Sequence, residues 1–202
     1  LKEHYQEMVE RLTRRIDTDP EDAGNYPLRA RYSIHLGDRK KVLDDLKKYA
    51  DIVKDSSVAA EAYDEVAWRL VGRHQQMVNP EIAVELYHKA HEMQPKDWRY
   101  LCGLGAAHYR TGQWEKAITT FAKSTELVDG ENALNYLFLA MAHWQLGNKA
   151  AATNWHNKAI EWIENSSINW LSAQGQMIYD IYLEAAELIG IKAKESDRKA
   201  YR

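Results

Sequence analysis

The sequence predicts an all-α protein built from antiparallel helix pairs, and three observations support this fold class. Apolar residues recur with the helical period of about 3.6 residues, and no segment shows a convincing strand alternation. The 202 residues include only four Pro and ten Gly, nearly all at expected helix ends. A pattern of small and large residues also recurs at intervals of about 34 residues, as it does in proteins built from stacked helix pairs.

The first expected helix covers residues 1–16, and four helix pairs follow it. The first helix has its apolar residues at helical spacing, and Pro20 follows its end. The four pairs form units of about 23–56, 58–95, 97–129 and 132–165. Their expected helices cover 23–36 with 39–54, 58–73 with 80–93, 97–110 with 114–127, and 132–145 with 149–164.

Small residues justify the pairing of these helices. Each first helix has a small residue where it meets its partner, which lets two backbones approach closely; these are Ala30, Ala67, Gly105 and Ala140. A glycine that can adopt the left-handed conformation follows three of the first helices; these are Gly37, Gly112 and Gly147. The two clearest copies of the repeat begin at Leu101 and Tyr136.

The chain is expected to end with a capping helix over 169–189, stopped by Gly190, and a polar tail over 191–202. Stacked helix pairs leave the face of the last pair uncovered, and a terminal helix of this kind covers it. Residues 1–190 are therefore expected to form a single helical domain.

The recurring pattern closely resembles the tetratricopeptide repeat (TPR), whose signature is W-x2-L-G-x2-Y, then Gly, then A-x3-F. In the clearest copy the matching residues are Leu101, Leu104, Gly105, His108, Gly112, Ala117 and Phe121. The resemblance covers nearly the whole chain and implies a right-handed superhelical solenoid that binds proteins. More narrowly, residues 66–68 and 138–147 resemble TPR arrays appended to large bacterial multidomain proteins. That likeness implies a piece of a longer polypeptide.

The resemblance also implies a concave groove lined by one stripe of each first helix. The residues on this stripe are Arg31, His35, Asp64, Trp68, Val71, Arg99, Cys102, Tyr109, Arg110, Leu134, Leu137, Met141 and Trp144. The family's carboxylate clamp uses Lys and Asn in this stripe, whereas the corresponding residues here are Pro27, Arg31, Asp64 and Trp68. We therefore expect an apolar, extended or helical peptide ligand, held by aromatic side chains, instead of a terminal carboxylate.

Two alternatives to this groove remain open. The helix over 132–145 is apolar nearly all round, so Leu134 and Trp144 are covered either by the chain itself, for instance by the terminal helix, or by a partner. The arginines Arg31, Arg99 and Arg110 either contact an anionic ligand or lie at the surface, solvated or ion-paired. The sequence does not decide between these possibilities.

The sequence shows no sign of an enzyme, a metal site or a cofactor site. It has no nucleophile or phosphate-binding motif, and the spacing of His88 and His91 does not match a known metal motif. The single cysteine, Cys102, excludes an internal disulfide, and a net charge of −3 disfavours nucleic acid as a partner. No apolar run is long enough to span a membrane. The sequence therefore predicts a soluble protein and favours a cytoplasmic over a secreted location.

Two function classes follow from these features of the sequence. In the first, which we favour, the chain is an interaction scaffold whose concave groove binds a peptide or domain of a partner protein. In the second, the chain is a structural solenoid whose apolar surface packs against other domains of its own polypeptide or against a second copy. The sequence does not identify the partner.

Overall fold

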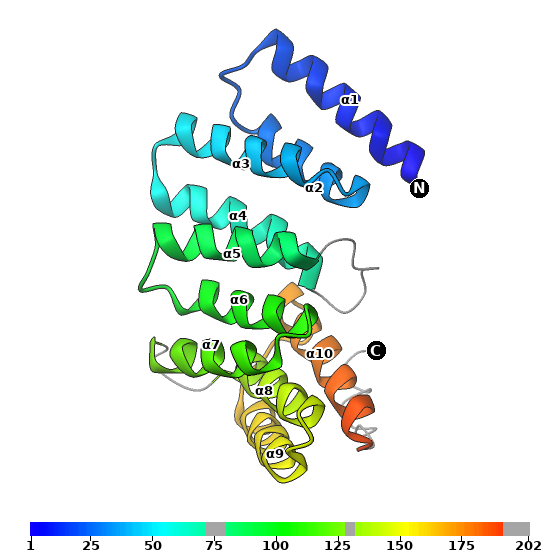
Figure 1. Ribbon diagram of the computed structural model, residues 1–202, viewed down its shortest axis with the longest axis vertical. Helices are drawn as coiled ribbons and strands as arrows, with labels where there is room; N and C mark the ends of the chain where they lie inside the picture. The colour runs from blue at the N-terminus through cyan, green and yellow to red at the C-terminus, as the bar shows by residue number, and fades with distance from the viewer. Residues whose placement is uncertain (72–79, 128–131, 192–202) are drawn as a thin grey trace. The chain divides into compact units, whose positions relative to one another are not determined.

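The structure, a computed structural model, describes residues 1–71, 80–127 and 132–191. In these residues the regular structure is helical throughout, which confirms the predicted all-α class. The helices are α1 (Lys2–Thr18), α2 (Asn25–Leu36), α3 (Arg39–Val53), α4 (Ser56–Val71), α5 (Pro80–Met93), α6 (Trp98–Arg110), α7 (Trp114–Leu127), α8 (Ala133–Gln145), α9 (Lys149–Asn165) and α10 (Ala173–Ile189), shown in Figure 1. The predicted tail beyond residue 191 and the predicted end of α4 lie outside the described residues.

The chain divides into two compact units, and the boundary lies inside α6. The N-terminal unit consists of α1 to α5 and α6 as far as Gly103, and the C-terminal unit consists of α6 from Leu104 together with α7 to α10. Helix pairs in a solenoid contact only their neighbours, so such a division is compatible with the single domain expected over residues 1–190. That single domain stays a prediction.

Within the N-terminal unit, consecutive helices pack on one another as antiparallel layers (Figure 1). The helix ends follow the predicted chemistry. Gly37, Gly112 and Gly147 have positive φ angles of 73°, 74° and 79°, so a left-handed residue follows each of the first helices α2, α6 and α8. Asp38 caps the following helix, because its carboxylate accepts a hydrogen bond from the Lys41 N–H at 3.0 Å.

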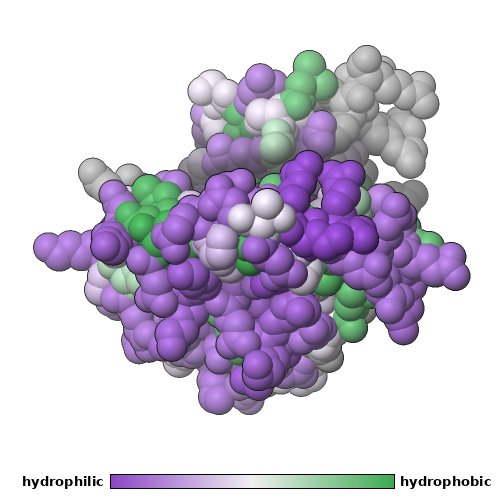
Figure 2. All heavy atoms as spheres, turned by 90° about the horizontal axis from the view of Figure 1, so that it is seen from above, coloured by the Kyte–Doolittle hydropathy of each residue, from purple (hydrophilic) through white to green (hydrophobic). Residues whose placement is uncertain are grey.

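The helices bury their apolar sides and turn their polar sides outward. Figure 2 shows one face of the molecule, which is mostly hydrophilic and has only small, separate apolar areas. Helices with one apolar stripe produce such a surface when that stripe packs on a neighbouring helix.

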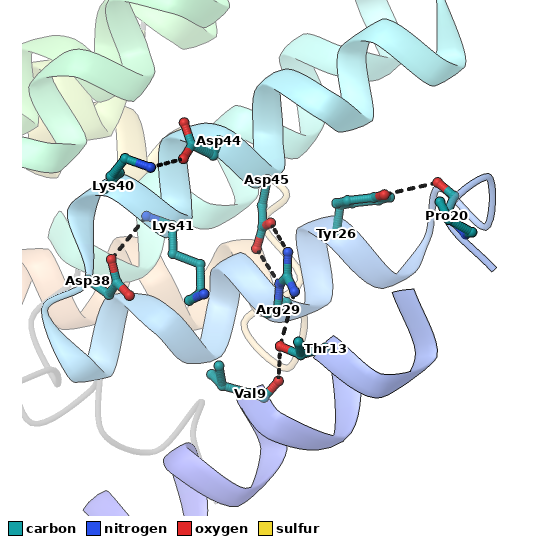
Figure 3. Close-up of polar contacts among 10 residues, drawn as sticks. All are labelled: Val9, Thr13, Pro20, Tyr26, Arg29, Asp38, Lys40, Lys41, Asp44 and Asp45. Carbon is teal, nitrogen blue, oxygen red and sulfur yellow. Dashed lines mark hydrogen bonds and ion pairs between the residues drawn. The ribbon is translucent and has the colours of Figure 1, made fainter. Parts of the chain in front are cut away.

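The first pair departs from the repeat pattern by placing Arg29 where an apolar residue is usual, and the structure shows how this is accommodated. Arg29 projects from α2 and donates two hydrogen bonds, of 2.6 and 3.0 Å, to the Asp45 carboxylate on α3 (Figure 3). It also donates to the Thr13 hydroxyl of α1 at 3.0 Å. Both members of the ion pair are mostly buried. The charged side chain of Arg29 therefore joins α1, α2 and α3 at a position where apolar side chains usually hold the helices together.

The last helix covers α8, as the capping prediction requires, but it begins later than expected. Every residue of α8 from Ala133 to Ala142 is buried, and α10 packs mainly on α8 and much less on α9. Helix α10 starts at Ala173 instead of residue 169, because the Ser172 hydroxyl accepts a hydrogen bond from the Gly175 N–H at 3.1 Å and so caps the helix there.

Candidate functional site

The predicted groove stripe separates into a buried part and a partly exposed part. Six of its thirteen residues are buried in the fold: Val71, Cys102, Tyr109, Leu134, Leu137 and Met141. A buried side chain offers almost no surface to a partner in this arrangement, so these six are core residues here. The stripe follows from the register of each helix, and the register does not specify which other helix covers a given residue.

In the C-terminal unit the cover is α10, and its contacts decide the alternatives left open for this region. Arg110 of α6 pairs with Glu184 of α10 through both carboxylate oxygens, one of them at 2.7 Å, and the Arg110 side chain is only 7% exposed. The guanidinium also lies over the ring of Phe138 at 5.6 Å. Leu134 is likewise buried within the chain. Arg110 and Leu134 thus serve an internal interface.

Trp144 lies at the end of α8 and is half-buried. The ammonium of Lys149 is 3.4 Å from the centre of its ring, a cation–π contact, and the same ammonium donates a hydrogen bond to the Trp144 carbonyl at 3.2 Å. Trp144 is therefore engaged locally and is not grouped with the partly exposed residues described next.

The five remaining residues of the stripe are all in the N-terminal unit, and we call them the N-terminal inner face: Arg31, His35, Asp64, Trp68 and Arg99. Arg31 and His35 are on α2, Asp64 and Trp68 are on α4, and Arg99 is on α6. All five are half-buried or exposed. Helices α2 and α4 are in direct contact, and the Arg31 guanidinium bridges them by pairing with Glu65 of α4 at 3.0 Å.

The charged groups of the N-terminal inner face are mostly paired. Glu65 also lies 3.7 Å from the Arg69 guanidinium, so it is shared by two arginines. The guanidinium of Arg99 binds both carboxylate oxygens of Asp97, at 2.6 to 3.0 Å. The His35 ring stacks on Tyr5 of α1 at 4.3 Å, and burial, followed by the charge of Arg69, lowers the pKa of His35. We therefore expect His35 to be neutral at pH 7.

Asp64 is the exception. In the part of the chain that the structure describes, no cationic side chain lies within ion-pair distance of its carboxylate. Burial raises the pKa of Asp64 to about 6, and the Tyr87 hydroxyl and the charge of Arg99 oppose that rise. Tyr87, on α5, is fully buried, and its hydroxyl makes no hydrogen bond of standard geometry although it faces Asp64 closely enough to favour the ionised carboxylate.

Sequence reasoning did not identify Tyr87 as a buried neighbour of Asp64. A Cβ added at Gly103 would lie 2.1 Å from the Tyr87 ring, so this glycine of α6 is what allows the ring to pack against the helix backbone. The signal was present in the sequence as an additional helix-interior glycine, two residues before the Gly105 of the repeat. Cys102 of α6 is buried, and burial, followed by the charge of Asp64, raises the pKa of its thiol to about 12.

Replacement of Asp64 by Asn is expected to stabilise the protein at neutral pH. The pKa of Asp64 in the folded protein, about 6, exceeds the ordinary value of 3.8. The free energy of unfolding therefore falls as the pH rises from about 4 to about 6, and it stays low at higher pH. A neutral amide in place of the carboxylate would avoid this loss, on the order of 1 kcal/mol. The neighbouring ionisable groups, which both forms share, are Glu61, Tyr87, Asp97, Arg99, Tyr100 and Cys102.

The measurement is thermal unfolding of both proteins at pH 5 and pH 7.5. The Asn variant should melt higher at pH 7.5, and the difference should shrink at pH 5, where the wild-type carboxyl is protonated. An equal difference at the two pH values would show that Asp64 is not buried in the way described.

Neither a metal site nor a membrane span emerges from the described residues. Within residues 1–71, 80–127 and 132–191, no three His, Cys, Asp or Glu side chains are grouped so that they could hold a metal ion. In the same residues, no helix combines the length and the apolar character needed to cross a bilayer. Two surface hollows, of about 500 and 450 Å³, lie beside α1 and near the end of α9. The N-terminal inner face contributes no residue to either.

The comparisons with known proteins agree with this architecture. The family model described as tetratricopeptide repeat matches residues 133–166, the pair α8 and α9. Among solved structures, a MamA chain from Desulfovibrio magneticus is 17% identical with a TM-score of 0.55, and the match covers 83% of this chain and 97% of that one. PilW, a widely conserved type IV pilus biogenesis factor, is 16% identical with a TM-score of 0.53, covering 98% and 91%.

A third similar structure is a thermophilic TPR protein of Thermus thermophilus. It is 17% identical with a TM-score of 0.51, and the match covers 93% of this chain and 91% of that one. The comparison with curated protein sequences found no match. The resemblance to TPR proteins and the predicted TPR-like fold are thus confirmed, and identities this low show the fold alone.

Proposed function

We propose that this protein, which has the fold of tetratricopeptide repeat proteins and contains a matching repeat at residues 133–166, is a scaffold that binds a peptide segment of a partner protein. The proposed binding surface is the N-terminal inner face. The observation that carries this choice is the contrast between the units: α10 covers the corresponding stripe of the C-terminal unit, whereas Arg31, Asp64 and Trp68 keep exposed area.

The chemistry of the N-terminal inner face suits an extended peptide. Trp68 offers a large, half-buried aromatic surface, and such residues commonly dominate the binding energy of protein interfaces. The charged groups around it could set the register of the bound segment. The arginines are already paired with Glu65 and Asp97, which argues against a terminal carboxylate as the main determinant of binding.

The second candidate function, a structural solenoid, is favoured by a separate observation. Leu171, in the connection between α9 and α10, is 74% exposed and follows the half-buried Trp170. An apolar protrusion of this kind suits packing against another domain or a second copy of the chain. Light scattering tests the second-copy form of this idea, since a concentration-independent monomer would contradict it.

Replacement of Trp68 by Ala is expected to weaken partner binding by about 2 kcal/mol, roughly 30-fold, with little loss of stability. Tyr109, which the sequence placed on the same stripe, is unsuitable for this test because it is buried against Phe138 at 5.7 Å between ring centres. The measurement is retention of the partner by the immobilised chain, with thermal unfolding of the same samples.

Two control variants make the result interpretable. Trp162→Ala removes a half-buried tryptophan from α9 and should leave binding unchanged. Leu104→Ala removes a buried leucine and should cost about 2–5 kcal/mol of stability. Full retention of the partner by a folded Trp68→Ala protein would move the binding surface elsewhere.

A further inference from the structure

The N-terminal inner face contains one carboxylate, Asp64, that has no cationic side chain within ion-pair distance among the described residues. Glu65 is held by Arg31 and Arg69, and Asp97 is held by Arg99. These contacts engage the three arginines, and of these Arg99 acts on Asp64 through its charge without forming an ion pair with it. Burying a charge without a partner costs stability, so an unpaired, largely buried Asp64 calls for a functional explanation.

A second observation concerns Tyr87 of α5, a buried neighbour of this carboxylate. The Tyr87 hydroxyl has no exposed area and no hydrogen-bond partner of standard geometry, although most buried hydroxyls are satisfied. It interacts electrostatically with both Asp64 and Cys102, so it is a buried neighbour of both groups. The site thus holds a donor, Tyr87, that can orient the carboxylate, while no cation of the described residues is within ion-pair distance of it.

Trp68 supplies an aromatic surface next to this carboxylate. It lies four residues after Asp64 on α4, and residues at that spacing are neighbours on the same helix face. A carboxylate beside an aromatic ring is suited to lysine or arginine, because the acid pairs with the charge and the ring attracts the cation through its π face. The exposed Glu61, one turn before Asp64, adds negative charge on the same side.

We propose that Asp64 and Trp68 form a recognition site for one cationic side chain, lysine or arginine, of the peptide that binds the N-terminal inner face. This inference rests on the proposed function and specifies the chemistry of its ligand. The bound cation would supply an ion-pair partner, which Asp64 does not find among the described residues. Asp64 would then act as a specificity determinant, and Trp68 as both anchor and specificity determinant.

The test uses pools of synthetic peptides that share one fixed central residue, either Lys, Arg, Glu or Leu, with all other positions randomised. The full chain is immobilised, and retention of each pool is measured at pH 7.5. Pools with Lys or Arg should be retained about tenfold more than the Glu pool, which corresponds to about 1.4 kcal/mol. Asp64→Asn should reduce this preference to about twofold or less, as expected for loss of the charged partner.

Glu81→Gln is the matched control, because it removes one negative charge from an exposed site on α5 of the same unit. It should keep the full preference for cationic pools.

The preference of the wild-type chain should also weaken at pH 5, because burial raises the pKa of Asp64 to about 6 and the carboxyl is then mostly protonated. The Asn variant should lack this pH dependence. The ionisable groups that act on Asp64 or respond to it are unchanged between the two proteins; they are Glu61, Tyr87, Asp97, Arg99, Tyr100 and Cys102.

The outcomes separate the two levels of the proposal. If the pools are retained above a blank surface but Lys and Arg give no advantage, or if Asp64→Asn keeps that advantage, the cation site is wrong and peptide binding stands. If no pool is retained above the blank surface, peptide binding by this face is itself contradicted, and the cation site with it.

Discussion

A chain shortened to end after Ser167 is expected to lose much of its stability and to aggregate. Helix α10 buries a row of apolar side chains against its own unit: Ile178, Tyr179, Ile181, Tyr182, Ala185, Ala186 and Ile189. Its removal would also uncover α8, which is buried on nearly every side. Since each large apolar side chain contributes about 1.5–3 kcal/mol when buried, a loss of about 5 kcal/mol or more is expected, which corresponds to roughly 10–20 °C in melting temperature.

The measurement is thermal unfolding by circular dichroism, with light scattering on the same samples. A chain that ends at Ile191 is the control, because it lacks the polar tail but keeps α10. A point variant tests the same interface more selectively: Glu184→Ala leaves Arg110 buried without its carboxylate and is expected to cost about 3–5 kcal/mol. Gln176→Ala, at an exposed site of α10, should be close to neutral. An unchanged melting temperature in the chain without α10 would show that this helix does not stabilise the stack.

The helices and their ends were predictable because their determinants are local. A helix ends at a left-handed glycine whatever it packs against, so Gly37, Gly112 and Gly147 marked three boundaries correctly. Side-chain caps are local too, but the cap at Ser172 was missed, because residues 169–172 fit the apolar spacing as well as the helix itself does. Local chemistry thus located the helix boundaries to within a few residues.

The binding surface was less predictable because it depends on which helix covers which face. The stripe inferred from α8 contained Leu137 and Met141, and both are fully buried under neighbouring helices. The pairing of Arg110 with Glu184 joins residues 74 positions apart, and no sequence period connects them. The pairing of Arg29 with Asp45 is a similar case, in which two charges replace the apolar contact that the pattern requires. Contacts of this kind depend on tertiary placement, which a single sequence does not specify.

Replacement of Gly103 by Ala is expected to destabilise the N-terminal unit strongly, although alanine is the better helix former by about 1 kcal/mol. The new Cβ would lie 2.1 and 2.2 Å from two carbon atoms of the Tyr87 ring and 2.7 Å from its hydroxyl oxygen. Tyr87 is fully buried in a packed interior, so the helix or the ring must move. We expect a net loss of about 3 kcal/mol, near the upper end of the usual cost of overpacking.

Two further variants test the cause of this loss. Gly24→Ala is the control, because the added Cβ would meet only the Asp22 carboxylate, at 3.6 Å, on a backbone with a φ of −62°. It should change the melting temperature very little.

Tyr87→Ala removes the ring and should itself cost about 3–5 kcal/mol, as truncation of a buried aromatic does. If the clash is the cause, Gly103→Ala should add almost no further loss in that background, and a double variant as destabilised as the sum of the two single changes would contradict it. The same steric requirement bears on binding, because Tyr87 interacts with Asp64. A folded protein with a displaced ring should lose part of its preference for cationic peptides even though Asp64 and Trp68 are intact.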